Sequence, residues 1–281
     1  MEIAGKKFDL NSHTYICGIL NVTADSFSDG GKYNSVDKAL SRVEQMIKDG
    51  TDIVDIGGES TRPGYVPVSA DEECERVLPV IESVKANFGV PISLDTYKPS
   101  VAKAGIEAGA DIINDIWGLK YSKDSAGGMS MAEVIAAYST PCILMHNREK
   151  QSYVNLMEDV KNDLIESVKI AKAAGISKDS IILDPGIGFA KSVEDNLKVL
   201  NHLSELFGEY HWLLGASRKS VIGASLNLPV DQRLEGTLAL TALAVERGAC
   251  MVRVHDILEN RRVIDMLECV KREAIAGDLR R

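Results

Sequence analysis

The stretch Ala108-Gly109-Ala110-Asp111-Ile112-Ile113-Asn114-Asp115-Ile116 contains the change from helix to strand that is repeated throughout this fold. The segment before it has helical spacing and closes on a glycine, which is a typical C-cap. The apolar run 111–116 then has the length of a buried strand and contains polar side chains near its end. Asp49-Gly50 and Arg247-Gly248 close two further helices in the same way. We therefore expect helices to alternate with buried strands.

This alternation extends along the whole chain. Eight apolar runs have the length of strands: Tyr15–Val22, Asp52–Gly57, Ile92–Asp95, Asp111–Ile116, Cys142–His146, Ile181–Asp184, Trp212–Ala216 and Met251–Val254. The segments between them have helical spacing: Ser35–Lys48, Ser69–Asn87, Pro99–Ala108, Met131–Tyr138, Val154–Ala174, Val193–Leu206, Leu234–Arg247 and Leu258–Ile275. The strands are almost continuously apolar, which is typical of parallel strands that helices cover.

Eight such units in 281 residues predict an α/β fold, a (β/α)8 TIM barrel that forms a single domain over residues 1–281. An open, doubly wound sheet is the alternative, because a strand count taken from sequence can err by one. In both architectures, ligands bind at the carboxyl ends of the strands.

Composition and charge exclude several classes of protein. The formal net charge of −9 argues against sequence-independent binding to nucleic acid, because phosphate backbones attract basic surfaces. The N-terminal segment lacks the apolar core of a signal peptide, and no run of eighteen apolar residues predicts a membrane span. The cysteines are widely spaced and form no CxxC pair, so we expect reduced thiols and a cytoplasmic protein.

Polar residues follow each apolar run. They are Asn21, Gly57-Gly58-Glu59, Asp95, Asn114-Asp115, His146, Asp184, Ser217-Arg218-Lys219 and Arg253-Val254-His255-Asp256. A single acidic residue in such a position is more often the N-cap of the next helix. Eight polar strand ends of mixed type favour a site, because a barrel gathers all of them around one mouth.

Two kinds of ligand chemistry follow from these residues. The loop 57–64 combines glycines with Thr61 and Arg62, and this set suits a phosphate, as do the cations and hydroxyls after the seventh and eighth strands. Asp95, Asn114 and Asp184 need a ligand rich in donors, because a buried carboxylate without one is costly. A ring with an amide N–H beside an exocyclic amine would provide these donors.

Two of these strand-end residues also have a purely structural interpretation. The backbone N–H groups of 185–188 are an equally good explanation for the carboxylate of Asp184. A histidine at a strand end, such as His146, is more often simply hydrogen-bonded than part of a binding site.

Taken in order, the motifs resemble those of the bacterial dihydropteroate synthases. The matching stretches are Asn21–Gly31, Asp55–Gly64, Asp95-Thr96-Tyr97-Lys98, Ile113-Asn114-Asp115, Asp184–Phe189, Ser217–Ser220 and Arg253–Asp256. The resemblance covers nearly the whole chain. It implies the condensation of (7,8-dihydropterin-6-yl)methyl diphosphate with 4-aminobenzoate to give 7,8-dihydropteroate and pyrophosphate, a step of folate biosynthesis.

The resemblance also implies roles for individual residues. It places the pterin against Asp95, Asn114, Asp184 and Lys219, and the diphosphate against Thr61, Arg62, Arg253 and His255. It places 4-aminobenzoate among Phe27, Pro63, Phe189, Arg218 and Ser220, and Mg2+ on Asn21. The groups nearest the chemistry are then Asp95, Lys219, Arg253 and His255. The resemblance further implies a homodimer and competition by sulfonamides.

The chemistry that this implies is dissociative. Pyrophosphate leaves readily once cations neutralise it, and the electron-rich pterin delocalises the cation left on the methylene carbon. We therefore expect a mechanism in which departure precedes attack by the aniline nitrogen.

Two departures from the family pattern stand out. Ala24 replaces the usual proline of the first loop, which gives that loop more backbone freedom. The connection 118–130 is long and has no evident role.

Two other functions compete with the synthase. A pterin-binding methyltransferase would share Asp95, Asn114 and Asp184, but it would not need the diphosphate residues. A non-catalytic pterin-binding barrel is the other alternative, and Ala24 is the reason to consider it.

Overall fold

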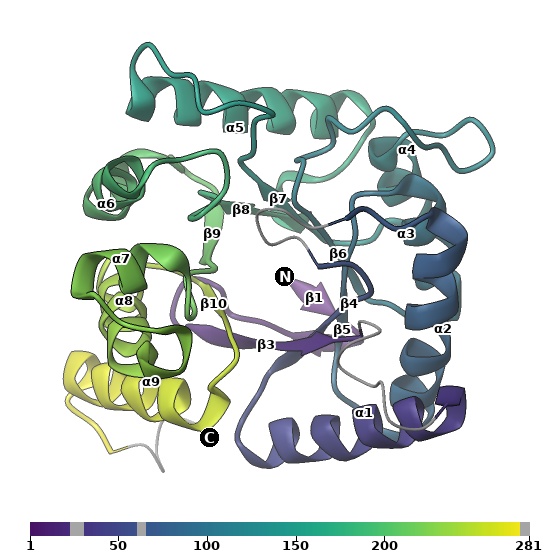
Figure 1. Cartoon of the computed structure of the whole chain (residues 1–281), viewed down its shortest axis with the longest axis horizontal. Helices are drawn as coiled ribbons and strands as arrows, with labels where there is room; N and C mark the ends of the chain where they lie inside the picture. The colour runs from purple at the N-terminus through teal and green to yellow at the C-terminus, as the bar shows by residue number, and fades with distance from the viewer. Residues whose placement is uncertain (23–30, 61–65, 276–281) are drawn as a thin grey trace.

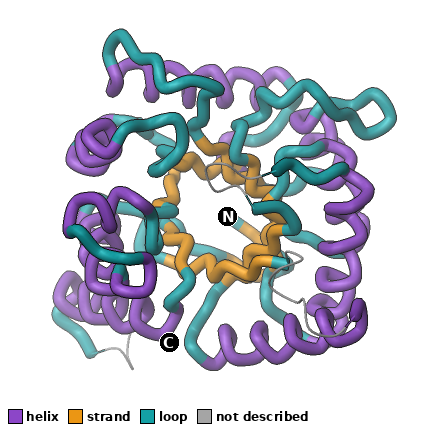
Figure 2. The backbone as a smooth tube through the Cα atoms, viewed as in Figure 1, coloured by secondary structure: helices purple, strands orange, loops and turns teal. Residues whose placement is uncertain are grey.

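The computed structural model describes residues 1–22, 31–60 and 66–275, with the backbone alone for 31–35. Eight parallel strands close into a barrel in the order β10-β3-β4-β5-β6-β7-β8-β9. Figures 1 and 2 look into this ring of strands, which an outer layer of helices surrounds. The barrel prediction is confirmed, and the open doubly wound sheet is excluded because β3 pairs with β10.

The strands of the barrel coincide with the eight predicted runs. Their bounds are β3 (Tyr15–Asn21), β4 (Ile53–Gly57), β5 (Ile92–Asp95), β6 (Ile112–Asp115), β7 (Cys142–Met145), β8 (Ile181–Asp184), β9 (His211–Leu214) and β10 (Met251–Val254). Only the ends differ, by one or two residues. Because parallel neighbours run in register, for example Asn21 with Gly57 and Asp95 with Asn114, all eight carboxyl ends open on one side.

The helices also follow the prediction: the ends of α2, α5, α8 and α9 differ from it by one to three residues, and three differences are larger. Their bounds are α1 (Gly31–Lys48), α2 (Ala70–Asn87), α3 (Pro99–Ala108), α4 (Met131–Tyr138), α5 (Leu156–Ala173), α6 (Val193–Asn201), α7 (Ser220–Leu226), α8 (Leu234–Glu246) and α9 (Ile257–Arg272). Helix α1 starts four residues earlier than predicted. The segment predicted to be one helix over 193–206 is α6 followed by a 3-10 turn, Leu203–Glu205. Helix α7 was not predicted, because seven residues are too few to show an apolar period.

Helix ends are fixed by a predicted glycine cap and by serine caps that were not predicted from the sequence. Gly109 ends α3 in the left-handed conformation, with φ +116°, which a residue with a Cβ rarely adopts. Ser69 caps α2, and Ser130 forms a capping box with Glu133 at the start of α4. The long connection 118–130 now has a role, since Asp124 accepts hydrogen bonds from the backbone and hydroxyl of Ser100 in the first turn of α3.

The barrel interior is built in two layers, because alternate residues of a strand point to the same side. Apart from Ser93 on β5, the lower layer is apolar and includes Cys17, Ile53, Ile112, Ile143, Ile182, Leu213 and Met251. Two residues further along each strand, the upper layer is largely polar and includes Asp55, Asp95, Asn114, Asp184 and Arg253. A second apolar cluster fills the space between the outer faces of the strands and the helices. The polar strand ends therefore stand on an apolar floor.

A short hairpin closes the opposite end of the barrel, and the sequence did not predict it. Strands β1 (Glu2–Ile3) and β2 (Lys6–Lys7) pair antiparallel, and in Figure 1 β1 lies inside the outline of the ring. Ile3, Phe8 and Leu10 pack against the lower layer, which excludes water from it. Each strand of this hairpin has only two residues, too few to show an alternating pattern.

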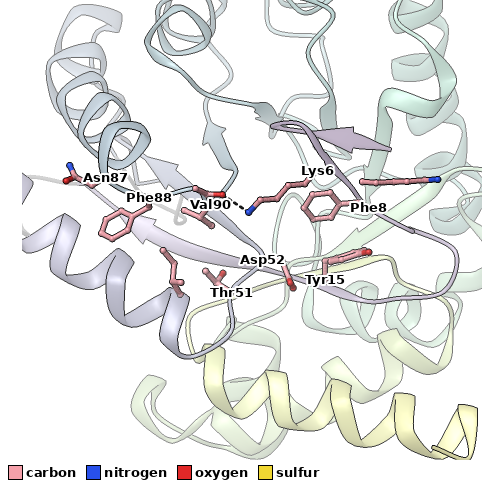
Figure 3. Close-up of a pocket in the computed structure, with 11 residues that line it drawn as sticks. Lys6, Phe8, Tyr15, Thr51, Asp52, Asn87, Phe88 and Val90 are labelled. Atoms are coloured by element: carbon pink, nitrogen blue, oxygen red, sulfur yellow. Dashed lines mark hydrogen bonds between the residues drawn. The ribbon is translucent and has the colours of Figure 1, made fainter. Parts of the chain in front are cut away.

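A shallow hollow of about 590 Å³ lies beside this hairpin, at the amino ends of the strands. Figure 3 shows Lys6 and Phe8 on one side of it, with Lys6 reaching the carbonyl of Gly89 at 2.5 Å. This hollow is at the end of the barrel opposite to the polar strand ends.

Two expectations from composition can also be compared with the structure. All five cysteines, Cys17, Cys74, Cys142, Cys250 and Cys269, are free thiols. Among the described helices, none has the length and the apolar character that a bilayer crossing requires.

Candidate active site

Arg253 on β10 is the centre of a buried ion-pair cluster in the upper layer. Its Nε donates to Oδ2 of Asp55 on β4 at 2.6 Å, and its Nη2 donates to Oδ2 of Asp95 on β5, also at 2.6 Å. Neither β4 nor β5 is adjacent to β10 in the barrel, so these contacts cross the interior. Among the described residues, Nη1 donates no hydrogen bond, which leaves this group for a ligand.

Burial sets the charges of this cluster. Burial raises the pKa of Asp95 to about 7, against the opposing effect of Arg253, and the nearby carboxylate of Asp55 raises it further. Burial would lower the pKa of Arg253, but Asp55 and Asp95 outweigh it and raise that pKa far above the ordinary value. The guanidinium is therefore permanently charged, while Asp95 is partly protonated near neutral pH.

Asn114 and Asp115 end β6 but do different things. The amide nitrogen of Asn114 donates to the carboxylate of Asp55 at 3.4 and 3.5 Å, which places its side chain beside the cluster of Arg253. Asp115 is fully buried and accepts from the backbone N–H groups of Trp117 and Leu119. Asp115 therefore shapes the following turn, and Asn114 belongs to the site.

A second group forms around β8. Oδ1 of Asp184 accepts from the backbone N–H of Gly186 at 2.7 Å. Among the described residues, Oδ2 accepts no hydrogen bond, so the carboxylate keeps one oxygen for a ligand. The expectation that 185–188 holds Asp184 is thus correct for one oxygen only. Burial raises the pKa of Asp184, and the ammonium of Lys219 opposes this.

Lys219 lies between Asp184 and an aromatic ring. Its Nζ donates to the carbonyl of Ile187 and lies 4.8 Å from the centroid of the Phe189 ring. Burial lowers the pKa of Lys219 to about 8, and the charges of Asp184 and Asp95 oppose this. Lys219 therefore loses its proton, and with it its charge, in mildly basic solution.

Gly215 follows β9 and joins the two groups. A Cβ placed there would lie 3.4 Å from Oδ2 of Asp184 and 3.8 Å from Cβ of Arg253. The absence of a side chain at this position leaves space beside both charged groups. Asp55, Asp95, Asn114, Asp184, Lys219 and Arg253 thus surround one region above the apolar floor.

The loops after β9 and β10 are tied together beside this region. Oγ of Ser217 lies 3.1 Å from Nδ1 of His255 and accepts from the His255 backbone N–H at 3.2 Å. Arg218 forms a bidentate pair with Asp256. Arg218 also adopts a φ of +56°, held by hydrogen bonds from its N–H to Thr237 and from Arg233 to its carbonyl.

His146 does not line the mouth of the barrel. Its side chain is fully buried, with Nε2 3.0 Å from Oδ2 of Asp163 and Nδ1 2.8 Å from Nζ of Lys191. The structural interpretation of this histidine is the correct one.

Comparison with known proteins identifies the family to which this chain belongs. The model of the pterin binding enzyme family matches residues 17–255, which includes every strand of the barrel except the first two residues of β3. A dihydropteroate synthase from Clostridium beijerinckii is 54% identical over 275 residues, which is 97% of this chain and 100% of that protein. The chain belongs to the dihydropteroate synthase family. As a family member, it is a pterin-binding enzyme of folate biosynthesis.

Solved structures of dihydropteroate synthases share this fold closely. The enzyme from Clostridium difficile, crystallised in the presence of pteroic acid, is 46% identical with a TM-score of 0.89, covering 95% of this chain and 100% of that one. The enzyme from Xanthomonas albilineans with 4-aminobenzoic acid is 38% identical with a TM-score of 0.88, covering 96% and 97%.

The structure brings together most of the predicted site residues that it describes. The four residues expected at the pterin all belong to the region above the apolar floor, with Arg253 beside them and His255 on the adjoining loop. Asn21 ends β3 beside Gly57, and Ser220 is exposed in the first turn of α7. Phe27, Thr61, Arg62 and Pro63, like Ala24, lie outside the described residues.

Sequence reasoning missed two residues that this dihydropteroate synthase fold places at the site or directly behind it. Asp55 was quoted only as part of a motif, yet its position inside an otherwise apolar strand was a signal of a functional carboxylate. Lys191 was not considered, because nothing in its local sequence shows that it is buried.

Proposed function

We propose that this chain condenses (7,8-dihydropterin-6-yl)methyl diphosphate with 4-aminobenzoate at the carboxyl end of the barrel. The observation that carries the proposal is that Asp184 and Lys219, which influence each other electrostatically, lie in the same site as the ion pairs of Arg253 with Asp55 and Asp95. Asp184 offers a hydrogen-bond acceptor and Lys219 a donor to a heterocycle. Arg253 and its two carboxylates offer charge at a reaction centre. The structures of relatives with pteroic acid and 4-aminobenzoic acid support this assignment.

The pterin ring matches the hydrogen-bonding groups of the site. Oδ2 of Asp184 accepts from the ring amide N–H and the exocyclic amine, which satisfies the one oxygen of this buried carboxylate that accepts no hydrogen bond from the described residues. Lys219 donates to the ring oxygen and nitrogen. The side-chain amide of Asn114, whose nitrogen donates to Asp55, offers its oxygen as a further acceptor for a ring donor.

The diphosphate lies against Arg253 and His255, together with Thr61 and Arg62. The Nη1 group of Arg253 donates to it, while Asp55 and Asp95 hold the other edge of the guanidinium in position. Ser217 fixes the ring of His255 through Nδ1. A phosphate site at the ends of the seventh and eighth barrel strands is common in this fold.

The described residues fit a magnesium ion that is held mainly by the substrate. Among them, no group of three or more His, Cys, Asp or Glu side chains converges as a metal site. Asn21 offers one amide oxygen at the end of β3, and Mg2+ characteristically keeps several waters and binds substrate phosphates. When bound, Mg2+ supplies neutralising charge at the pyrophosphate oxygens.

The reaction is dissociative. The bond between the methylene carbon and the diphosphate oxygen breaks first, and the electron pair leaves with pyrophosphate. The carboxylate of Asp95 stabilises the cation on that carbon, and the aniline nitrogen then forms the new C–N bond and releases a proton to water. The second substrate needs only to be positioned beside Phe189, Arg218 and Ser220, with Phe27 and Pro63 completing its site.

Secondary isotope effects at the two methylene hydrogens test the order of these steps. We expect a normal effect well above unity, because the carbon becomes trigonal before attack. An effect near unity would support concerted displacement. Mass spectrometry of the product, with either substrate left out as the control, tests the overall reaction.

The two competing functions are less well supported. A pterin-dependent methyltransferase has no use for Arg253 and His255 beside the pterin, and the relatives found are synthases. A barrel that only binds pterin would bind it without releasing pyrophosphate. An assay of pyrophosphate release therefore separates this function from the synthase.

We also propose a cytoplasmic homodimer that sulfonamides inhibit in competition with 4-aminobenzoate. Five free thiols support a reducing compartment. Met266 and Val270, one turn apart on α9, are 60% and 62% exposed, which suits a contact with a second copy. Sedimentation equilibrium measures the oligomeric state, and a monomeric mass would contradict this proposal.

A further inference from the structure

Lys191 is a buried lysine directly behind the loop that follows β8. Burial lowers the pKa of its ammonium to about 7, against the opposing charge of Asp184. Only 5% of this residue is exposed. Its Nζ lies 2.8 Å from Nδ1 of His146, 3.0 Å from the carbonyl oxygen of Gly186 and 3.2 Å from that of Phe189. Three acceptors match the three N–H groups of an ammonium.

The charge state of its neighbour makes this arrangement specific. Burial lowers the pKa of His146 to about 4, so the imidazole is neutral near pH 7. Its Nε2 faces the carboxylate of Asp163 at 3.0 Å and must carry the proton, because a carboxylate only accepts. Nδ1 is then an acceptor and takes a hydrogen bond from Lys191.

Asp163 is in turn held from the other side. Burial tends to raise the pKa of Asp163, but hydrogen bonds from His146 and Arg148 outweigh burial and lower it well below its ordinary value. Arg148 also stacks over Tyr153, whose hydroxyl donates to the carbonyl of Ala190 at 2.8 Å. The loop after β8 is therefore anchored to the loop after β7.

Three residues of the loop after β8 contact the residues of the site. The N–H of Gly186 donates to Asp184, the carbonyl of Ile187 accepts from Lys219, and the ring of Phe189 lies under the same ammonium. Lys191 binds the carbonyls of Gly186 and Phe189, the first and last of these three residues. The loop conformation that its ammonium fixes is thus the conformation that orients Asp184, Lys219 and Phe189.

We propose that Lys191 is a positioning residue for both substrates: through His146 and the carbonyls of Gly186 and Phe189, it holds the 185–190 loop in the shape that receives the pterin and 4-aminobenzoate. It touches neither substrate. This inference rests on the proposed function and deepens it.

The test compares Lys191→Met with the wild type in steady-state kinetics. We expect the KM values for the dihydropterin diphosphate and for 4-aminobenzoate to rise about tenfold or more, the scale of one lost charge-assisted hydrogen bond. Lys191→Gln, which keeps two donors, recovers part of this loss and serves as the second variant if Lys191→Met does not fold.

Two controls separate positioning from stability. Lys198→Met removes an exposed lysine of α6 and leaves both KM values within about twofold of the wild type. Val84→Ala removes core packing in α2, on the other side of the barrel, so it lowers the melting temperature without changing either KM. If Lys191→Met and Lys191→Gln behave like Val84→Ala, the role of Lys191 is only structural and the proposal is wrong.

A binding measurement keeps this test independent of turnover. Calorimetry with 6-hydroxymethyl-7,8-dihydropterin compares pterin affinity in the wild type, Lys191→Met and Lys198→Met. Weaker binding by Lys191→Met alone supports the positioning role even if the wild type releases no pyrophosphate, which would contradict the proposed function instead. Equal affinity in all three proteins overturns the positioning of the pterin by Lys191.

Discussion

Nη2 of Arg253 lies 2.6 Å from Oδ2 of Asp95, across the interior of the barrel. The same guanidinium binds Asp55 through Nε, so one cation orders two carboxylates of neighbouring strands. Once Asp95 is ionised, above a pH of about 7, this cluster has one more negative than positive charge, which suits a step in which a cation develops on the substrate. The arrangement explains why the upper layer of this barrel is polar despite the cost of burial.

Asp55→Asn tests whether the cluster acts as a unit. The substitution removes one charge-assisted hydrogen bond of Arg253 but leaves its pair with Asp95, so we expect the free energy of unfolding to fall by about 1–3 kcal/mol. We expect kcat/KM to fall about a hundredfold, because Arg253 is no longer held in position. Urea unfolding and steady-state kinetics measure the two effects. Glu44→Gln, which breaks only a surface pair with Lys48, is the control and should change stability by less than about 1 kcal/mol.

The affinity for pterin depends on pH through Lys219. Its pKa is lowered to about 8 in the unliganded protein, so the ammonium that donates to the ring is present below that pH and is lost above it. We expect the dissociation constant for 6-hydroxymethyl-7,8-dihydropterin to rise as the pH passes through about 8. In Lys219→Met, binding is weaker and this step is absent. A step of the same size in the variant would assign the titration to another group.

His146 provides a prediction on ionisation and stability. Because its pKa is lowered to about 4, the ring stays neutral in the folded protein over a range where an unfolded histidine becomes charged. The unfolded state then binds more protons, so the free energy of unfolding falls as the pH is lowered from about 6.5 toward 4. Nitrogen NMR should find the proton on Nε2 and no titration of this ring near neutral pH. A titration with an ordinary midpoint would contradict the buried network.

Gly186→Ala tests the fit of the 185–190 loop. Gly186 has a φ of +67°, and an added Cβ would lie 2.0 Å from the carbonyl oxygen of His146. We expect a stability loss of about 3 kcal/mol or more, with weaker pterin binding, because backbone must move. Gly208→Ala is the matched control, since Gly208 has a φ of +56° but no atom within 4 Å of the added Cβ. It should cost about 1–2 kcal/mol, from the left-handed backbone alone.

Most of the fold was predictable because its signals are local. The apolar runs and the glycines at positions 50, 109 and 248 mark strands and helix ends, and all three glycines have positive φ. The hairpin β1–β2 and helix α7 are too short to show a period. Their positions are decided by tertiary contacts, such as those of Ile3 with the lower layer of the barrel.

From the residues alone, the sequence could predict only those members of the site that lie at or near the ends of strands. Asp95, Asn114, Asp184 and Arg253 could be inferred because parallel strands bring their ends together. The partners of these residues could not be inferred, since the contact of Arg253 with Asp55 joins residues 198 positions apart. The burial of Lys191 likewise depends on His146, which lies 45 positions away.

We propose that the site at the carboxyl ends of the strands joins the two substrates and releases pyrophosphate. A coupled assay of pyrophosphate release, with dihydropterin diphosphate, 4-aminobenzoate and Mg2+ present together or each left out in turn, tests it most directly. We expect release that needs all three and falls strongly in Asp184→Asn. Pterin binding without release, or release that does not need 4-aminobenzoate, would contradict it.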